Sequence, residues 1–217
     1  MIDTLLIWNS LPDLLHGAAM SLQITCIAAF IGLSLGSIFA IGEISKSKVI
    51  SSAISCYVIF FRGTPMLIQI LFIYYVMPQF GLTAPPFLAA SIAIGLNSCV
   101  YISQIIRSGM NAVGKGQFEA AQALGFTKTK TMRYIVFPQA FRVALPALGN
   151  EMITLIKDSS LASIIGVMEL TKEASIIRSR TYDAFSILLA VALIYLIMTA
   201  TISLFLKKFE KRLKRHV

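Results

Sequence analysis

Glu151, Lys157 and Asp158 are ionisable residues in an otherwise apolar stretch of the sequence, and they are the first candidates for chemistry. If that stretch crosses a membrane, each charge costs roughly 2.5–3.5 kcal/mol or more, so such residues mark functional sites by default. At 100° per residue, Glu151 and Asp158 share one helical face with Thr154, while Asn150 and Lys157 lie on the adjacent face. Both faces can line one cavity. The alternative is an internal pair between Lys157 and a carboxylate, or a contact to a second subunit.

A second row of polar residues lies in a charge-free stretch. Asn97, Tyr101 and Gln104 recur at i, i+4 and i+7, which places them on one helical face with Asn97 near mid-membrane. Binding sites inside membrane proteins are expected at this depth, between helices. Asn97 and Tyr101 are therefore candidates for ligand contact.

Arg62 precedes the sequence Gly63-Thr64-Pro65, which predicts a break in a helix. Proline disfavours helical geometry at the residue before it, and glycine tolerates any backbone conformation. We expect Arg62 to donate to carbonyls that the break frees, or to a neighbouring helix, rather than to contact a ligand.

Two other sequence patterns, a phosphate-binding loop and a cysteine site, are not supported. Gly109–Lys115 satisfies G-x-x-x-x-G-K, but Gly116 stands where Ser or Thr would hold magnesium, and the segment does not follow a β-strand. The cysteines lack C-x-x-C spacing and are expected to be buried small apolar residues: Cys26, Cys56 and Cys99. We expect no metal site and no cofactor in this chain.

The chain as a whole is too apolar for a soluble domain. Of its 217 residues 57% are hydrophobic and 13% are charged, with a mean hydropathy of +0.79. Stretches of about 20 apolar residues can cross a membrane as helices, and they are too long for barrel strands. We predict a single all-α membrane domain over residues 1–217. Its five transmembrane helices are expected at about 18–42, 52–77, 87–107, 146–168 and 184–206.

Lys and Arg residues set the predicted orientation, because cytoplasmic loops collect them. An N-terminus outside and a C-terminus in the cytoplasm place these residues inside: Lys46, Lys48, Arg107, Lys115, Lys128, Lys130, Arg133, Arg142, Lys207, Lys208, Lys211, Arg212, Lys214 and Arg215. Only Lys172, Arg178 and Arg180 fall outside, and Arg62 and Lys157 lie within spans. The net charge of +9 is thus an orientation signal, and nucleic acid is not an expected partner.

The longest polar segment, residues 108–142, is cytoplasmic in this topology. Glu119 suits the positive end of a helix dipole, alanines follow it, and Gly125 is placed to end the helix. A helix of two turns is too short to be stable alone in water. It must dock either on its own chain or on a partner.

Three segments together resemble one family. Glu119-Ala120-Ala121 with Gly125, Ile135 and Pro138 resembles the EAA loop of ABC-importer permease subunits, with Phe137 where that family usually has Leu. Two further segments are similar to the polar amino-acid permeases of the histidine, glutamine and arginine type: Phe61–Pro65 with Gln69, and Leu145–Glu151 with Lys157–Ser159. The resemblance covers roughly residues 14–213.

The resemblance implies a function and a set of partners. It implies a multi-pass permease of the inner membrane, embedded in lipid, that transports amino acids by alternating access. A second permease subunit, identical or different, and an extracytoplasmic substrate-binding protein are implied. Separate cytoplasmic ATPase subunits bind ATP and magnesium and hydrolyse the ATP, so this chain is not itself an enzyme. The coupling helix against those ATPases would consist of Glu119, Ala120, Ala121, Gly125 and Phe126.

If the substrate is an amino acid, as the resemblance implies, the polar residues can bind its charged groups. An amino-acid zwitterion needs donors for its carboxylate, which Lys157 could supply, and an anion for its ammonium, which Glu151 or Asp158 could supply. The net charge of that span leans weakly toward cationic substrates. The full expected substrate set is Glu151, Asn97, Lys157, Asp158, Thr154, Asn150 and Tyr101.

Two alternatives stay open. An ion-coupled secondary transporter would use Asp158 or Glu151 as its coupling site, but we find no internal repeat. Residues 169–180 are expected to form an amphipathic helix that either meets the binding protein, as the resemblance implies, or lies on the membrane surface. An intramembrane enzyme would need facing Asp, Ser/His or His pairs, which the sequence lacks.

Overall fold

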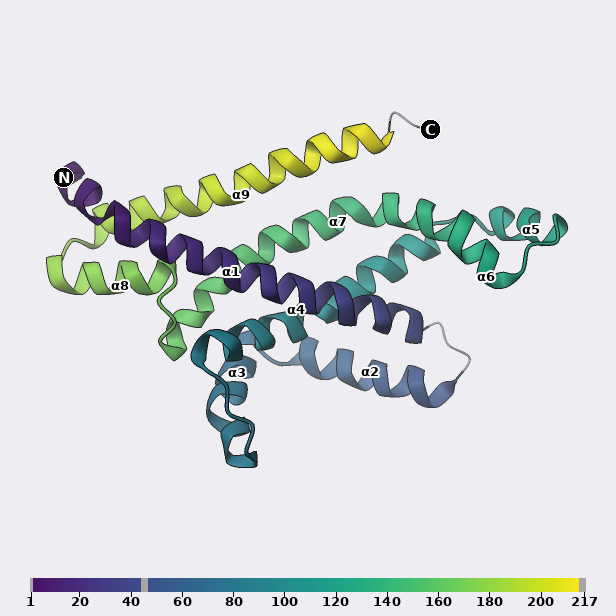
Figure 1. Ribbon diagram of the computed structural model, residues 1–217, viewed down its shortest axis with the longest axis horizontal. Helices are drawn as coiled ribbons and strands as arrows, with labels where there is room; N and C mark the ends of the chain where they lie inside the picture. Colours follow the sequence, from purple (N-terminus) through teal and green to yellow (C-terminus); the bar gives the residue numbers. More distant parts are fainter. Residues whose placement is uncertain (1, 44–46, 215–217) are drawn as a thin grey trace.

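The structure is a computed structural model that describes residues 2–43 and 47–214. The described part is helical throughout (Figure 1). Its elements are α1 (Thr4–Glu43), α2 (Lys48–Gly63), α3 (Met66–Leu71), η1 (Phe72–Val76), η2 (Met77–Phe80), α4 (Pro86–Asn111), α5 (Lys115–Ala123), α6 (Lys128–Thr131), η3 (Met132–Val136), α7 (Phe137–Asp158), η4 (Ser159–Ile165), α8 (Leu170–Thr181) and α9 (Ala184–Lys214). Lys46, Arg215 and His216 lie outside the described residues.

The long helices α1, α4, α7 and α9 run along the long axis of the molecule (Figure 1). α4 packs between α1 and α7, and α7 also contacts α9. Glycines permit this close packing, as is common between membrane helices. A Cβ atom on Gly36 would lie 2.8 Å from the Cys99 carbonyl oxygen, and one on Gly109 would lie 2.6 Å from that of Ala140.

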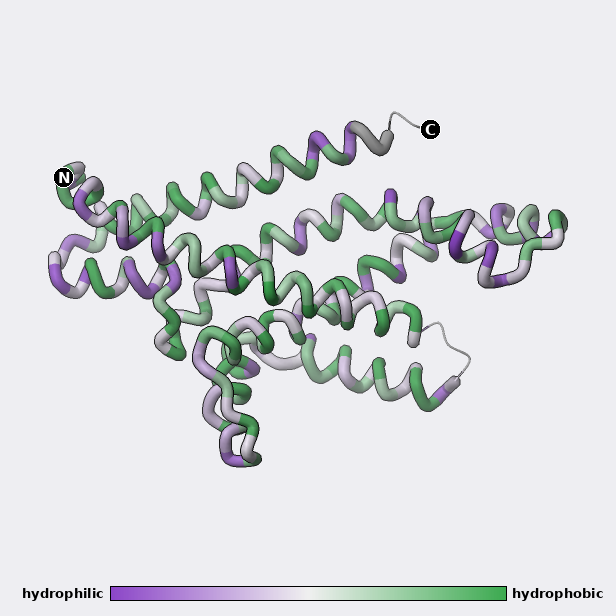
Figure 2. The backbone as a smooth tube through the Cα atoms, viewed as in Figure 1, coloured by the Kyte–Doolittle hydropathy of each residue, from purple (hydrophilic) through white to green (hydrophobic). Residues whose placement is uncertain are grey.

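The outer surface of the bundle is apolar. Phe30 on α1 is 73% exposed and Phe205 on α9 is 70% exposed, although both are large hydrophobic side chains. Figure 2 shows hydrophilic segments at the two ends of the long axis, in α8 and in α5–α6. A helix that is apolar on its outer side is typical of a membrane protein.

Three helices are long and apolar enough to cross a membrane: Thr4–Glu43, Pro86–Asn111 and Ala184–Lys211. A fourth span results if the bent pair Lys48–Gly63 and Met66–Phe80 is counted as one. α7 is not among the helices that meet this criterion, so the prediction of five spans is confirmed only in its coarser form, as an all-helical membrane protein with three to four candidate spans.

Two helix boundaries differ from the predicted ones. The first helix begins at Thr4, ahead of the predicted span at 18–42, because Pro12 is tolerated inside it. The fourth predicted segment, 146–168, is shifted: α7 begins at Phe137, and residues 159–165 form the 3-10 helix η4. Arg142 had placed residues up to 142 in the loop, but a charge does not end a helix.

The predicted break after Arg62 is confirmed. α2 ends at Gly63, α3 begins at Met66, and the two directions differ by 106°. Thr64 is extended, with φ −117° and ψ 142°, as expected for a residue that precedes proline.

Candidate functional site

A cavity of about 370 Å³ lies between α2, α4 and α7. Its polar lining consists of Arg62 from the last turn of α2, three residues of α4 and one of α7: Tyr101, Gln104, Ser108 and Glu151. The α4 residues follow one another at spacings of three and four, so they share one face. Ala144 and Ala147 on α7 also line the cavity, and their small side chains leave room for it.

Glu151 is held by a buried hydroxyl. Ser98 Oγ donates to Glu151 Oε1 at 2.7 Å, and the Ser98 side chain is 1% exposed. Within the described residues Glu151 Oε2 has no partner, and no side-chain nitrogen or oxygen there is both buried and unpaired. Oε2 is therefore an accessible acceptor on a side chain that lines the cavity.

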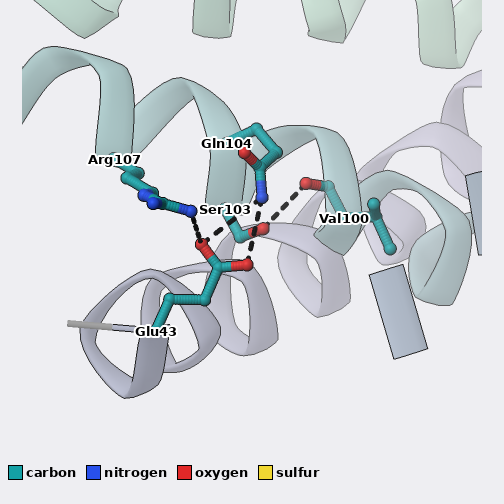
Figure 3. Close-up of polar contacts among 5 residues, drawn as sticks. All are labelled: Glu43, Val100, Ser103, Gln104 and Arg107. Carbon is teal, nitrogen blue, oxygen red and sulfur yellow. Dashed lines mark hydrogen bonds and ion pairs between the residues drawn. The ribbon is translucent and has the colours of Figure 1, made fainter. Parts of the chain in front are cut away.

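Gln104 connects the cavity to Glu43, the last residue of α1. Gln104 Nε2 donates to Glu43 Oε1 at 3.1 Å and to Oε2 at 3.4 Å, and Arg107 Nη1 lies 3.0 Å from Oε2 (Figure 3). The Glu43 side chain is only 5% exposed. Glu43 does not stand out in the sequence, because it lies at the end of an apolar stretch, next to a loop.

Asn97 is bonded to a neighbouring helix in this structure. It is 4% exposed and donates from Nδ2 to Gln69 Oε1 at 2.9 Å. Gln69 Nε2 in turn donates to the carbonyl oxygens of Phe61 and Thr64, at 3.0 Å and 3.1 Å. Asn97 thus ties α4 to the break after α2, and it does not line the cavity.

Arg62 also differs from expectation. The carbonyls that the break frees are bonded by Gln69, not by the Arg62 guanidinium. Arg62 is exposed and lines the cavity, and no ion pair or hydrogen bond engages it in the described part of the chain. The cavity therefore holds an unpaired cation together with Glu151.

The other predicted substrate residues lie apart from the cavity. Lys157 is exposed and Asp158 is half-buried, and within residues 2–43 and 47–214 no ion pair joins them. Thr154 Oγ1 donates to the Asn150 carbonyl at 3.2 Å. Of the seven predicted residues, the structure brings Glu151 and Tyr101 together in the cavity, with Arg62 beside them.

Glu169, which no sequence pattern marks as special, is fully buried in the link between η4 and α8. It caps α8 by accepting from the Thr171 and Lys172 backbone N–H groups at 2.9 Å and 2.7 Å. The Tyr195 hydroxyl on α9 and the Ser21 hydroxyl on α1 also donate to it. Burial raises the pKa of the Glu169 carboxyl, against these hydrogen bonds, which lower it.

α5 forms within the polar segment 108–142 and ends as the sequence suggested. Gly125 has φ +76°, its N–H donates to the Gln122 carbonyl, and the Phe126 N–H donates to that of Ala121. This pair of bonds is a Schellman motif, which needs the left-handed conformation at Gly125.

One face of α5 packs on its own chain and the other is free. Ala121 is buried, and α5 contacts α6 and η3. Glu119, Ala120 and Phe126 are exposed, as is Leu124, whose large apolar side chain is 75% exposed. The helix therefore keeps an outward surface after docking on its own chain.

Comparison with known proteins decides the family. Residues 32–215 match the model of the family described as the binding-protein-dependent transport system inner membrane component. The chain belongs to this family. It is 39% identical over 201 residues to the putative glutamine transport system permease protein GlnP of Rickettsia bellii, which covers 92% of both chains. It is 38% identical to the arginine transport system permease protein ArtQ of Bacillus subtilis, over 94% of both, and 37% identical to GlnP of Escherichia coli, over 96% of both.

Solved structures agree with this family. An amino acid ABC transporter crystallised with histidines superposes with a TM-score of 0.92 at 42% identity, covering 98% of this chain and 99% of that one. The methionine ABC transporter MetNI, in inward facing conformations, gives a TM-score of 0.81 at 19% identity over 98% and 99% of the chains. The second likeness shows the fold alone.

Membership of this family makes the chain a multi-pass permease subunit of an ABC transporter in the inner membrane. It is a transport component and not an enzyme. The family implies partnership with ATPase subunits and a substrate-binding protein. The alternative of an ion-coupled secondary transporter finds no support among the relatives.

Proposed function

We propose that this permease carries polar amino acids, with a lean toward cationic ones, and that the cavity between α2, α4 and α7 is part of the path. The observation that carries the proposal is the pairing of opposite charges in one cavity, Arg62 from α2 and Glu151 from α7. At about 370 Å³ the cavity lies within the range of roughly 300–1,000 Å³ that is typical of small-ligand pockets. The relatives named for glutamine and arginine transport support this cargo class.

The chemistry of an amino acid fits the lining of this cavity. The planar Arg62 guanidinium suits the α-carboxylate, because its donors match carboxylate geometry. Glu151, whose Oε2 is free, suits the α-ammonium. Tyr101 offers a hydroxyl beside them. Hydrogen bonds to charged groups are worth roughly 1.5–3 kcal/mol each, so two such contacts are enough for selective binding.

We propose that the remaining candidate residues act in other parts of the substrate path. Lys157 and Asp158 follow Glu151 by about two turns on α7, so they suit a stretch of the path beyond the cavity. Asn150 directly precedes Glu151, and Thr154 lies between Glu151 and Lys157. Asn97, which is bonded to Gln69, acts on the path only through the position of the helix break, unless α3 moves during the transport cycle.

We further propose five spans, with the N-terminus outside and the C-terminus in the cytoplasm. α7 serves as the span between α4 and α9, because it contacts both of them and α1 as well. Glu151 on this helix then faces the cavity rather than lipid. The positive charges of α6 and η3 belong at the cytoplasmic end, where such residues collect: Lys128, Lys130 and Arg133.

The exposed face of α5 is the proposed contact with the ATPase subunit. Glu119, Ala120 and Phe126 remain free after Ala121 has packed on its own chain, and Gly125 fixes where the helix ends. Two permease subunits would form the path, and α8 would face the substrate-binding protein. ATP and magnesium would bind to the ATPase subunits, whose closure switches the cavity between its two openings.

Direct binding tests the cavity. Labelled arginine, histidine and glutamine are titrated against the permease–ATPase complex in lipid nanodiscs, without the binding protein. Arg62→Ala and Glu151→Gln should each weaken binding about tenfold or more, the worth of one charged hydrogen bond. Lys130→Ala, an exposed basic residue outside the cavity, serves as the matched control and should bind as the unmodified chain does. Unchanged binding by both cavity variants would remove this cavity from the path.

A further inference from the structure

Glu43 occupies a position that is electrostatically unfavourable for a carboxylate. It is the last residue of α1, where the helix dipole is negative, and its side chain is almost fully covered. Two neighbours on α4 compensate for this: the Arg107 guanidinium at 3.0 Å and the Gln104 amide at 3.1 Å. Of these two, Gln104 also lines the cavity.

The chemistry of the two groups fixes the orientation of the Gln104 amide. An ionised carboxylate only accepts hydrogen bonds, whereas an amide has a donor end and an acceptor end. Gln104 must therefore turn its NH₂ group toward Glu43. Its oxygen, Oε1, then lies on the side of the amide that points away from Glu43 (Figure 3).

That oxygen is available to a ligand. Gln104 Oε1 has no hydrogen-bond partner among residues 2–43 and 47–214, and in the same residues no buried side-chain oxygen lacks one. Oε1 is therefore accessible, like Oε2 of Glu151. Among the described residues that line the cavity, Glu151 and Gln104 thus each offer a free carbonyl or carboxylate oxygen, and Arg62 is the one cation.

We propose that Glu43 is a positioning residue that sets the charge preference of the cavity by holding the Gln104 carbonyl oxygen toward the substrate. This inference rests on the proposed function. When Arg62 binds the α-carboxylate and Glu151 binds the α-ammonium, Gln104 Oε1 is left for a second donor group. A cationic side chain supplies a charged donor at that point. Without Glu43, the amide can turn and present its NH₂ group, which repels a cation.

The test compares arginine with glutamine, a cationic and a neutral amino acid of similar length. Both are titrated against the permease–ATPase complex in nanodiscs. Glu43→Gln removes the acceptor-only group while it keeps the size of the side chain. Arginine binding should weaken about tenfold, the worth of one hydrogen bond to a charged group, whereas glutamine binding should stay within about twofold.

The exchange variant Glu43→Gln with Gln104→Glu tests whether Glu43 orients the Gln104 amide or only holds α1 against α4. The contact between α1 and α4 is then kept with its partners swapped, and the cavity again receives an acceptor-only group. Arginine binding should return to the level of the unmodified chain or exceed it. Co-purification of the ATPase subunit with each variant checks that the complex is intact.

Two outcomes would overturn the inference. One is an arginine-to-glutamine ratio that Glu43→Gln leaves unchanged, including an equal loss of both. The other is failure of the exchange variant to restore arginine binding while its complex stays intact. If the unmodified complex binds neither amino acid, the proposed function itself fails, and this result is distinct from the other two.

Discussion

At the scale of single residues, each buried carboxylate in the bundle has a specific set of donors. Glu151 is held by Ser98, Glu43 by Gln104 and Arg107, and Glu169 by backbone N–H groups and two hydroxyls. A buried polar group without partners is destabilising, so these donors stabilise the carboxyl groups in their places.

Glu169 should make the stability of the end of the bundle that holds α8 depend on pH. Its pKa is raised by burial above the ordinary value of 4.5, so the folded state keeps the proton longer than the unfolded state does. Stability should therefore be greatest below pH 4.5 and fall as pH rises through the raised pKa. Glu169→Gln should flatten this dependence.

Hydrogen exchange at the amides of α8, followed across this pH range in detergent, checks that expectation. Glu210→Gln, which removes a carboxylate near the end of α9, is the control and should keep the pH dependence of the unmodified chain. A Glu169→Gln variant with the same slope as the unmodified chain would show that Glu169 is not the group responsible.

The sequence allowed some of the important ionisable residues to be predicted, but it did not show which residues they bond. Glu151 stood out because a charge in an apolar stretch is costly, and it does line the cavity. Asn97 was expected to contact ligand on the same reasoning, yet its amide bonds Gln69. Helical spacing shows which side chains share a face. It does not show which neighbouring helix that face meets.

At the scale of elements, the Gln69 side chain ties together the two sides of the break between α2 and α3. Gln69 bonds two freed carbonyls with its NH₂ group and accepts from Asn97 with its oxygen. The residues around Pro65 predict the break itself. The role of Gln69 follows only from the fold, because it depends on α3 turning back toward α2 and α4.

Gln69→Ala should destabilise the permease by about 3 kcal/mol or more, because each buried polar group left unpaired costs roughly 1–3 kcal/mol. The Phe61 and Thr64 carbonyls and the Asn97 amide would all lose a partner. Thermal unfolding of the purified chain in detergent measures the effect. Gln23→Ala, an exposed glutamine on α1, is the control, and equal stability of the two variants would contradict the role of Gln69.

Variants that disturb the end of α5 or its exposed charge should weaken the proposed contact with the ATPase subunit. Gly125→Val places a β-branched residue at φ +76°, which strains the backbone by roughly 1–3 kcal/mol and opposes the Schellman motif. Glu119→Lys leaves the helix intact but reverses an exposed charge. Both variants should retain less ATPase subunit on co-purification from membranes.

Gly116→Ala is the matched control for α5, since a Cβ there meets no atom within 4 Å. It should retain the ATPase subunit as the unmodified chain does. If Gly125→Val and Glu119→Lys also co-purify with normal amounts of the subunit, α5 is not the contact.

At the scale of the whole molecule, the apolar helices with hydrophilic ends are those of a membrane protein. The family implies that this protein acts together with partner subunits. The high apolar content and the loop pattern were enough to predict the membrane fold and the family. The number of spans was harder to predict, because α7 carries Glu151, Lys157 and Asp158 and is not apolar enough to count among the candidate spans. A helix shielded by its neighbours has no need to be apolar all round.

The energy source for transport is the most direct test of the account. The permease is reconstituted into lipid vesicles, with and without its ATPase subunits and binding protein, and uptake of labelled arginine and glutamine is followed. The account predicts uptake only in the complete assembly, dependent on ATP and unaffected by ionophores that collapse proton and sodium gradients. Uptake by the permease alone, driven by an ion gradient without ATP, would contradict it.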